Sequence, residues 1–414
     1  MTCFLFADGT RTLAEFRTLG GLGEHDSASL IALAAEADLR GRGGAGFPFA
    51  RKLSAVAESV DPVRIAIANG EEGEPGSVKD RVLMRTKPHL VLDGLRLAAS
   101  AVGAQRSIVY VSDIESAVVL RAVIANEGSS FGSIEVFEVP PAYVAGEETA
   151  AVRAIDGGPA LPTAKPPRPF EAGVGGHPTL IANVETLAQF AMLAARGASE
   201  FGRGTLLSTV HSSTHSGALV EVPVGTPMRE VLALVTPIQD VRAILTGGLF
   251  GGVQPAALFD VALEHDALRA AGSALGCAAF HVVSASDCVV ELVTDAMSFL
   301  GRESAQQCGS CLKGTAAMAA AMRRIAAGDH ADTDVEALGR WAVSLRGRGN
   351  CALLDAACLM LSSLLEHWRL DLESHAVGHG CELCRARVIA DDFAITRLRV
   401  PPTLVPLSLE GITT

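Results

Sequence analysis

The stretch N-G-E-E-G-E-P-G-S-V-K-D at residues 69–80 decides how the rest of the chain is interpreted. It follows a short apolar run, Val63–Ala68, that reads as a strand. Gly and Pro oppose both helix and strand interiors, so a loop is expected at the end of that strand. Sites in α/β proteins commonly lie in such loops, but a lone acidic loop is as often a solvated turn. Whether this stretch is a functional site or a solvated turn therefore depends on the other motifs of the chain.

Length and composition predict a globular protein of two or three domains. The chain has 414 residues, of which 49% are hydrophobic and 19% charged, enough for a large core. A net charge of −12 argues against nucleic-acid binding, because phosphate binding needs basic patches.

The location expected from the sequence is cytoplasmic. The first ten residues lack the basic start and cleavage site of a signal peptide. The most apolar windows, at 91–102 and 351–365, are too short or too interrupted to span a membrane. In the cytoplasm, nine cysteines indicate metal or redox chemistry rather than a disulfide framework.

A glycine-rich turn precedes the acidic stretch. Gly41, Gly43 and Gly46 match G-x-G-x-x-G, but the match lacks the preceding strand of a dinucleotide fingerprint. Such a turn brings backbone N–H groups close to a phosphate or a flavin, and Arg42 and Lys52 could add positive charge. The alternative is a flexible connector.

Element predictions for the first half of the chain follow from periodicity and turn residues. A helix is expected at 27–37, with Asp26 as N-cap. The others are a helix at 82–102, strands at 107–111 and 134–139, a helix opening at 146–150, a Pro-rich loop at 164–170 and a helix opening at 183–187.

The second half changes in composition near residue 202. Strand-like runs at 206–210, 218–222, 243–245 and 247–252, with a helix at 227–234, predict a small α+β unit. Residues 287–370 are helical in pattern, and an irregular tail is expected from 375 to 414. The predicted domains are 1–201, 202–286, 287–372 and a tail at 373–414.

Close cysteine spacing indicates a metal centre. Cys308 and Cys311 form a C-x-x-C, and Cys351 lies downstream. Such thiolates can bind one centre together, although four normally hold a [4Fe–4S] cluster and a purely structural role is the alternative. The remaining cysteines outside the tail lie singly in apolar surroundings and are interpreted as core residues: Cys3, Cys277, Cys288 and Cys358.

Taken together, these motifs resemble one family, the flavin-bearing NADH-binding (51 kDa type) subunit of respiratory complex I, with relatives in soluble hydrogenases and formate dehydrogenases. The matching stretches occur in the family's order over about residues 30–370. They are L-R-G-R-G-G-A-G-F-P at 39–48, N-G-E-E-G-E-P-G-S-V-K-D-R at 69–81, K-P-H at 87–89, G-E-E-T-A at 146–150, A-N-V-E-T-L-A at 182–188, E-S-x-x-x-C-x-x-C at 303–311 and C-x-L-x-D-A-A at 351–357.

The resemblance implies an α/β fold class with a Rossmann-like FMN-binding domain, a β-grasp-like (α+β) middle domain and a C-terminal helical bundle that carries an iron–sulfur site. In the family, NADH passes a hydride to FMN, and electrons leave singly through the iron–sulfur centre. The resemblance thus implies an NAD(P)H dehydrogenase, diaphorase-like, that donates to a ferredoxin-like carrier or another electron-transfer subunit.

Position by position, the resemblance implies three groups of site residues. FMN and nucleotide would be held by Gly41, Arg42, Gly43, Gly44, Gly46, Phe47, Lys52, Asn69, Glu71, Glu72, Gly146, Glu147, Lys165 and Asn183. Glu74 and Glu148 would face the nicotinamide nucleotide and are the implied catalytic residues. Cys308, Cys311 and Cys351 would bind the cluster.

The chain departs from the family at the cluster. Ala305 replaces the first cluster cysteine. The fourth ligand could then be water, Ser304 or a distant residue, or the cluster could be [3Fe–4S] or absent. Cys381 and Cys384 of the tail could supply it, could form a separate site with His375 or His379, or could have no such role.

The nucleotide pocket departs as well. Arg168 stands where the family has an aromatic residue, and the aromatic that follows the glycine-loop lysine in the family is missing from Leu53-Ser54-Ala55 after Lys52. Two stacking faces are therefore lost. Arg168 could attract a phosphate and favour NADPH. Glu71 replaces a usual Asp, and Ala182 replaces an Asn.

Three hypotheses follow. The first is a stand-alone, divergent flavin oxidoreductase subunit that moves electrons between NAD(P)H and a one-electron carrier. The second is an FMN and iron–sulfur electron-transfer subunit that no longer oxidises NAD(P)H. The third is a structural or assembly protein without cofactors, against which the intact glycine and acidic loops argue.

Overall fold

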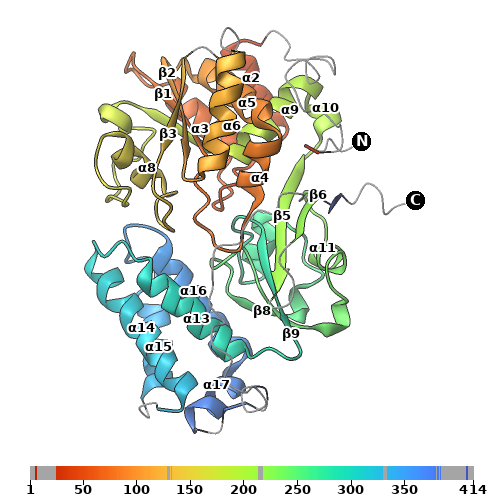
Figure 1. Cartoon of the computed structure of the whole chain (residues 1–414), viewed down its shortest axis with the longest axis vertical. Helices are drawn as coiled ribbons and strands as arrows, with labels where there is room; N and C mark the ends of the chain where they lie inside the picture. Colours follow the sequence, from red (N-terminus) through yellow and green to blue (C-terminus); the bar gives the residue numbers. More distant parts are fainter. Residues whose placement is uncertain are drawn as a thin grey trace.

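The computed structural model describes residues 5–6, 25–127, 131, 133–212, 218–329, 333–378, 380–381, 383 and 407–408. Cys3, His379 and Cys384 lie outside these residues. The described part forms three regions (Figure 1). An α/β region lies at the top of the view, a mixed sheet at lower right and a helical bundle at lower left.

The α/β region is built on a parallel four-stranded sheet of order β3-β2-β1-β4. Its strands are β1 (Ile65–Asn69), β2 (Arg106–Val111), β3 (Ile134–Glu138) and β4 (Thr179–Asn183). From β1 the chain adds β2 and β3 on one side and β4 on the other. The position between β1 and β4, where the order of the strands changes direction, is the topological switch point of the sheet. Ligands of such sheets bind there, beyond the carboxyl ends of the strands.

Strand β1 shows how the sheet is packed. Ala66 and Ala68 face the core that includes helices α5 (Pro88–Val102) and α9 (Val184–Arg196). Ile65 and Ile67 face α8 (Glu148–Ile155) on the other side. All four side chains are buried. The small alanine side chains let α5 and α9 approach the sheet closely. With α8 on the other face, helices cover the sheet on both sides.

The helices around this sheet follow their sequence signals with one exception. They are α2 (Ser27–Glu36), α3 (Phe49–Ala57), α4 (Lys79–Thr86), α6 (Ile114–Asn126) and the short α10 (Ala198–Phe201). Asp26 caps α2 as predicted, accepting from Ser29 N at 2.7 Å. The helical periodicity predicted at 82–102 is confirmed, but it is divided between α4 and α5. Two helices meet there, because Pro88 lacks an N–H and therefore starts α5.

The middle region is a mixed sheet of order β10-β6-β5-β9-β7-β8, with β5 parallel to β9 at its centre. Its strands are β5 (Thr205–Ser212), β6 (Ala218–Pro223), β7 (Val241–Leu245), β8 (Val253–Pro255), β9 (Ala279–Ser284) and β10 (Leu407–Ser408). Helices α11 (Met228–Ala233) and α12 (His265–Ala270) accompany it. The β5–β6 hairpin beside a parallel central pair gives the β-grasp-like arrangement.

The β-rich run predicted at 247–252 is wrong. This segment is a turn between β7 and β8. Gly247, Gly248 and Gly252 have φ of +60°, +68° and +73°, a conformation that favours glycine and that strands do not use.

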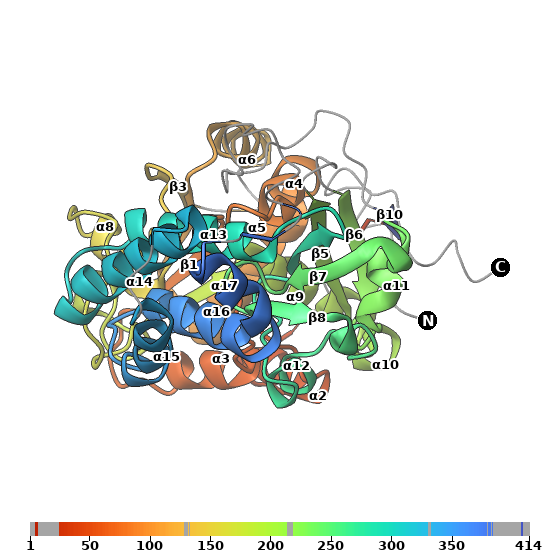
Figure 2. The same ribbon diagram turned by 90° about the horizontal axis from the view of Figure 1, so that it is seen from below.

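The C-terminal region is a helical bundle. It contains α13 (Val289–Arg302), α14 (Gly309–Ala327), α15 (Asp334–Ser344), α16 (Leu353–His367) and α17 (Arg369–Ala376). Seen from below, α17 lies against α16 (Figure 2). His375, predicted in the irregular tail, belongs to α17. Among the described helices, none combines the length and apolarity that a membrane crossing requires.

Candidate functional site

Two asparagines mark the carboxyl edge of the parallel sheet at its switch point. Asn69 ends β1, Asn183 ends β4, and the two are register partners. Asn69 Nδ2 donates to Gly146 O at 2.8 Å. Asn183 caps α9, accepting from Glu185 N at 3.0 Å, and its Nδ2 donates to Asp80 at 2.7 Å. The strand ends, the acidic loop and the G-E-E-T-A segment are thereby brought together.

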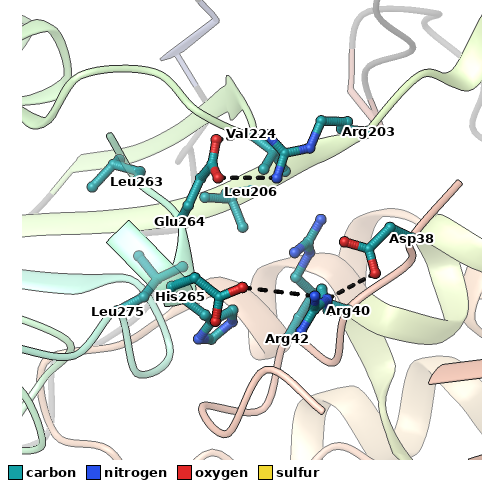
Figure 3. A pocket seen from close by; sticks show the side chains of 11 residues that line it. Asp38, Arg40, Arg42, Arg203, Leu206, Val224, Leu263, Glu264, His265 and Leu275 are labelled. Atoms are coloured by element: carbon teal, nitrogen blue, oxygen red, sulfur yellow. Dashed lines mark hydrogen bonds and ion pairs between the residues drawn. The ribbon is translucent and has the colours of Figure 1, made fainter. Parts of the chain in front are cut away.

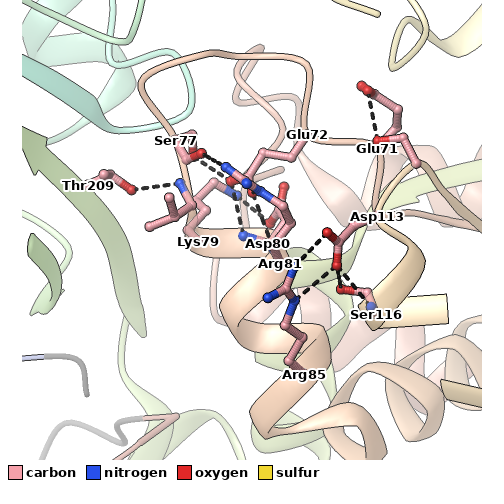
Figure 4. Close-up of polar contacts among 12 residues, drawn as sticks. Glu71, Glu72, Ser77, Lys79, Asp80, Arg81, Arg85, Asp113, Ser116 and Thr209 are labelled. Carbon is pink, nitrogen blue, oxygen red and sulfur yellow. Dashed lines mark hydrogen bonds and ion pairs between the residues drawn. The ribbon is translucent and has the colours of Figure 1, made fainter. Parts of the chain in front are cut away.

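The acidic loop, residues 69–80, is held by Glu72 (Figure 4). Glu72 accepts from Arg81 Nε at 3.0 Å and from Asp80 N at 3.1 Å. Burial alone would raise the pKa of Glu72, but Arg81 and Lys79 hold that pKa below its ordinary value. Glu72 therefore organises the loop as an ionised carboxylate.

Lys79 is a buried cation beside the acidic loop that the sequence did not single out. Its side chain is 1% exposed, and Nζ lies 2.7 Å from Asp80 and 2.9 Å from Glu185. Burial lowers the pKa of a lysine, but Asp80 and Glu185 reverse this and raise the pKa of Lys79. The K-D pair at 79–80 was visible in the sequence, but nothing there indicated that Glu185 of α9 lies beside it.

Glu71 and Gly146 contact each other closely. Ser112 Oγ donates to Glu71 Oε1 at 3.2 Å. A Cβ on Gly146 would lie 2.7 Å from Glu71 Oε2, so no other residue fits at 146 while Glu71 keeps this position. Gly146 therefore lies directly against the acidic loop, next to Glu147 and Glu148.

The glycine loop, residues 41–46, lies between α2 and α3, without a preceding strand, as the sequence indicated. Arg42 N donates to Thr186 Oγ1 at 2.8 Å. The amides of Gly43, Ala45 and Gly46 donate to no backbone carbonyl within the described ranges. The Arg42 guanidinium is buried, with Nε 4.0 Å from Glu185 Oε1. Amides without backbone acceptors beside a buried cation fit an anionic group such as a flavin phosphate.

A solvent-open hollow of about 330 Å³ borders the glycine loop from the middle region (Figure 3). Arg40 and Arg203, which line it, are paired with Asp38 at 2.9 Å and Glu264 at 2.6 Å. His265 closes over Gly46, where a Cβ would lie 2.4 Å from the ring. Burial and Arg42 lower the pKa of His265 to about 4, so the ring is neutral at pH 7. The side chains that line the hollow therefore add little net charge beside the glycine loop.

Two lysines predicted to hold cofactor or nucleotide pair with the two acids at the start of α8. Lys52 Nζ pairs with Glu148 and donates to Ile181 O at 2.9 Å. Lys165 Nζ lies 2.6 Å from Glu147 Oε1. Glu147 also caps α8, accepting from Thr149 N at 2.9 Å. Residues from four separate stretches therefore converge at one helix start.

Glu74 lies where the acidic loop meets the turn at 247–252. It accepts from Leu249 N at 3.3 Å and from the Tyr143 hydroxyl at 3.4 Å. A Cβ on Gly248 would lie 2.2 Å from Glu74 Cδ, so this glycine makes room for the carboxyl group. Burial raises the pKa of Glu74 to about 7. The group can therefore hold or release a proton near neutral pH.

The aromatic residue that the resemblance places at the cofactor, Phe47, lies at the surface. Phe47 is 44% exposed, and the Arg51 guanidinium lies over its ring at 5.7 Å. Arg168, at a family aromatic position, is exposed, and its backbone N donates to Glu171 at 2.7 Å. A cation thus stands where a flat apolar face was expected.

Cys308, Cys311 and Cys351 gather at the start of α14. Burial raises the pKa of the Cys311 thiol, and nearby Cys308 and Cys351 raise it further. Ser304 Oγ lies 3.0 Å from Cys311 Sγ, whereas Ala305 offers no ligand atom. The donor set of three thiols and a neighbouring hydroxyl fits a cluster with one non-cysteine ligand.

The cysteine group directly adjoins the α/β region. Tyr143 N donates to Glu303 Oε2 at 3.2 Å. Gln307 accepts from Arg153 at 2.7 Å and donates to Pro162 O at 2.6 Å. Burial raises the pKa of Cys351, and Glu147 adds to that rise. The thiols and the acids of α8 therefore lie on facing sides of one interface.

The cysteines interpreted as core residues differ in their burial. Cys288 and Cys358 are buried in the bundle core. Cys277 is only half-buried, at the junction where Gly276 pairs with Gly44 of the glycine loop.

Comparison with known proteins identifies the same two regions. A family model described as the Nuo51 FMN-binding domain matches residues 34–191. A second, described as the NADH-ubiquinone oxidoreductase-F iron-sulfur binding region, matches residues 291–375. The NADH-quinone oxidoreductase F 2 subunit of Rhizobium meliloti (strain 1021) is 33% identical over 87% of this chain and 91% of its own length. The F subunit of the same enzyme in Rickettsia typhi (strain ATCC VR-144 / Wilmington) is 30% identical, with coverages of 83% and 87%.

Solved structures of an NAD+-reducing [NiFe]-hydrogenase are also similar. The air-oxidized state matches with a TM-score of 0.78 and 31% identity over 85% of this chain. The H2-reduced state matches with a TM-score of 0.79 and 30% identity over 89% of this chain. This chain spans 63% and 66% of those hydrogenase chains, respectively.

Proposed function

This chain belongs to the family of NADH-quinone oxidoreductase F subunits, and we propose that it oxidises a nicotinamide nucleotide and passes the electrons singly to a protein carrier. The observation that carries the proposal is the convergence of the glycine loop, the acidic loop and the start of α8 at the switch point of the parallel sheet. When bound there, FMN supplies the conversion between two-electron and one-electron transfer.

The residues proposed to hold FMN supply complementary groups. The amides of Gly43, Ala45 and Gly46 and the buried Arg42 offer donors and positive charge to a phosphate. The other proposed FMN contacts are Gly41, Gly44, Phe47, Lys52, Asn69, Glu71, Glu72, Gly146, Glu147 and Asn183. Fixed polar groups orient a flat cofactor without moving when it binds.

The nucleotide is proposed to bind between Glu74 and Glu148, with Lys165 and Phe47 at its outer part. Glu148 is oriented by Lys52, and Glu74 by Leu249 N and Tyr143. Arg168 adds an exposed cation at the position of a lost aromatic, which favours a phosphorylated nucleotide such as NADPH over stacking of NADH.

Cys308, Cys311 and Cys351 are proposed to ligate the iron–sulfur cluster, with Ser304 at the fourth position. Ser304 is preferred over water because its hydroxyl already contacts Cys311. The acceptor is proposed to be a ferredoxin-like protein or a partner subunit, since the curated relatives are themselves named as subunits.

A second candidate is an electron-transfer subunit that holds FMN and a cluster but no longer oxidises NAD(P)H. The observation that favours it is the loss of two aromatic residues from the nucleotide pocket, one replaced by Arg168 and one missing after Lys52.

The test is reduction of ferricyanide by the purified, flavin-loaded chain with NADH and separately with NADPH. The proposal expects turnover with at least one nucleotide. It expects Glu148→Gln to lower kcat/KM by about tenfold or more, since the variant loses a carboxylate placed at the nucleotide. Glu36→Gln, an exposed position on α2, should match the wild type. No turnover with either nucleotide, although flavin and iron are present, would favour the second candidate.

A further inference from the structure

Three potential metal ligands meet at the foot of the helical bundle, away from the site described above. They are Cys288, His375 and Cys381, and their ligand atoms all lie within 4.8 Å of one another. Cys288 and His375 are buried, and Cys381 is half-buried. Cys288 Sγ lies 3.5 Å from His375 Nε2. Zn–S bonds of about 2.3 Å and Zn–N bonds of about 2.0 Å at tetrahedral angles separate neighbouring ligand atoms by roughly 3.5–3.8 Å.

The imidazole is oriented for metal binding. His375 Nδ1 lies 2.7 Å from Asp371 O. A carbonyl oxygen only accepts, so Nδ1 must carry the proton and Nε2 keeps its lone pair. Nε2 is the nitrogen that faces Cys288. A backbone carbonyl on the far nitrogen is the usual way in which proteins fix a metal-binding histidine.

Cys288 is fixed at the start of a helix. It is the N-cap of α13, and its Sγ accepts from Glu291 N at 3.5 Å. This contact holds the sulfur at the end of α13 that faces His375.

Cys381 reaches this position because the chain reverses after α17. Gly378 and Gly380 have φ of +77° and +57°, and Ser374 Oγ donates to Gly380 O at 2.8 Å. The contact from Ser374 holds Gly380, which precedes Cys381, against α17. The three ligands thus come from the start of α13, the end of α17 and the reversal that follows α17.

This site is separate from the iron–sulfur cysteines. Cys308 caps the start of α14, which has 19 residues and is therefore about 28 Å long. A Cβ on Gly328, at the other end of α14, would lie 3.5 Å from Gly378 Cα. Cys381 follows Gly378 by three residues and therefore lies near the end of α14 that is opposite Cys308. The length of α14 thus places Cys381 too far from Cys308 to complete the same cluster.

We propose that Cys288, His375 and Cys381 bind a zinc ion that ties the first helix of the bundle to the last. Two thiolates and an imidazole at this spacing suit a single tetrahedral ion of borderline softness. Each binding thiol releases its proton to solvent. Cys384 has the C-x-x-C spacing of a further ligand but lies outside the described residues, and the proposal does not depend on it.

The proposed role of the ion is structural. Near the ligands, Arg242 of β7 lies 2.5 Å from Asp371 of α17 and 5.3 Å from the Trp368 ring. Arg242 also donates to Asp287 O at 3.3 Å, next to Cys288. A zinc ion there would fix the end of α17 to the start of α13, beside the contacts that Arg242 makes from the middle sheet.

The test is the zinc content of the full chain, purified without chelator and measured by mass spectrometry together with iron and flavin. The expected result is about one zinc per chain in the wild type, with loss of most of that zinc in Cys381→Ser and in His375→Gln. Cys358→Ala changes a buried cysteine of the same bundle that belongs to no such ligand group among the described residues, and this variant should keep the zinc. Iron and flavin should be unchanged in Cys381→Ser, which separates this result from failure of the proposed function.

Cobalt substitution provides a second measurement, independent of zinc contamination. Visible ligand-field bands of tetrahedral thiolate-bound Co²⁺ should appear in the wild type and in Cys358→Ala, and should disappear in Cys381→Ser. A wild type without zinc after growth in zinc-supplemented medium would overturn the proposal. Equal zinc in the wild type and in both ligand variants would overturn it as well.

Discussion

Asn69 and Asn183 stand opposite each other at the carboxyl ends of β1 and β4. One amide holds the G-E-E-T-A segment through Gly146, and the other holds the acidic loop through Asp80. The two side chains thus connect the sheet to both loops that carry the candidate acids. The positions of both loops relative to the sheet therefore depend on this pair of asparagines.

Replacing Asn69 should reduce flavin binding. Asn69→Ala removes the bond to Gly146 O, so the approach of the segment to the sheet is no longer fixed. We expect at least a tenfold weaker FMN affinity, corresponding to about 1.4 kcal/mol, measured by fluorescence titration of the deflavinated chain. Asn126→Ala, at the exposed end of α6, serves as control. Unchanged affinity in Asn69→Ala would show that the amide does not shape the site.

Replacing Lys79 should destabilise the protein strongly. Lys79→Met leaves Asp80 and Glu185 buried without their cation, and breaking a buried pair in this way costs about 3–5 kcal/mol. Chemical denaturation should show this loss, while Lys313→Met, at an exposed position of α14, should stay within about 0.5 kcal/mol of wild type. A small effect at Lys79 would mean that the acids are neutral in the folded protein.

Glu74 should make stability depend on pH in a predictable direction. Its pKa is raised from 4.5 to about 7, so between these pH values the folded protein binds more protons than the unfolded chain. Wild-type stability should therefore fall relative to Glu74→Gln as the pH rises from about 4.5, with the loss complete above about pH 7. Since Glu74 is half-buried, we expect a change on the order of 1 kcal/mol.

The measurement for Glu74 is the difference in unfolding free energy between the two proteins at several pH values from 5 to 8. Comparison with the variant cancels the contributions of other carboxyl groups. A difference that stays constant over this range would contradict the raised pKa of Glu74.

Restoring the missing thiol should strengthen the cluster. Ala305→Cys places a thiolate at the family's fourth position, and thiolates are the normal ligands of such clusters. We expect Ala305→Cys to lose iron in air more slowly than the wild type does. Absorbance and iron analysis measure this loss. Ser304→Ala should lose iron faster. If neither variant changes the rate, residues 304 and 305 do not contact the cluster.

Much of the fold could be predicted because its signals are local. The Asp26 cap, the strand before the acidic stretch and the helix opening at Asn183 each depend on neighbouring residues, and all appear in the structure. The division of the helical region 82–102 at Pro88 and the turn at 247–252 also depend on local residues. Apolar periodicity does not reveal either feature, because one comes from a proline that starts a helix and the other from three glycines with positive φ.

What the sequence did not reveal depends on contacts between distant segments. Lys79 meets Glu185 only because α4 and α9 start side by side. Cys288 was interpreted as a core residue because it is isolated in the sequence, yet the fold places it beside His375, 87 residues away. Such contacts leave no periodic or motif signal in a single chain.

The most direct test of the central claim is an anaerobic absorbance titration of the purified, FMN-reconstituted chain with NADH and then with NADPH. The account predicts a bound flavin band that bleaches with at least one nucleotide, together with iron and sulfide that remain with the chain. A chain that takes up no flavin after reconstitution would contradict the account, because the glycine loop and acidic loop would then form no cofactor site.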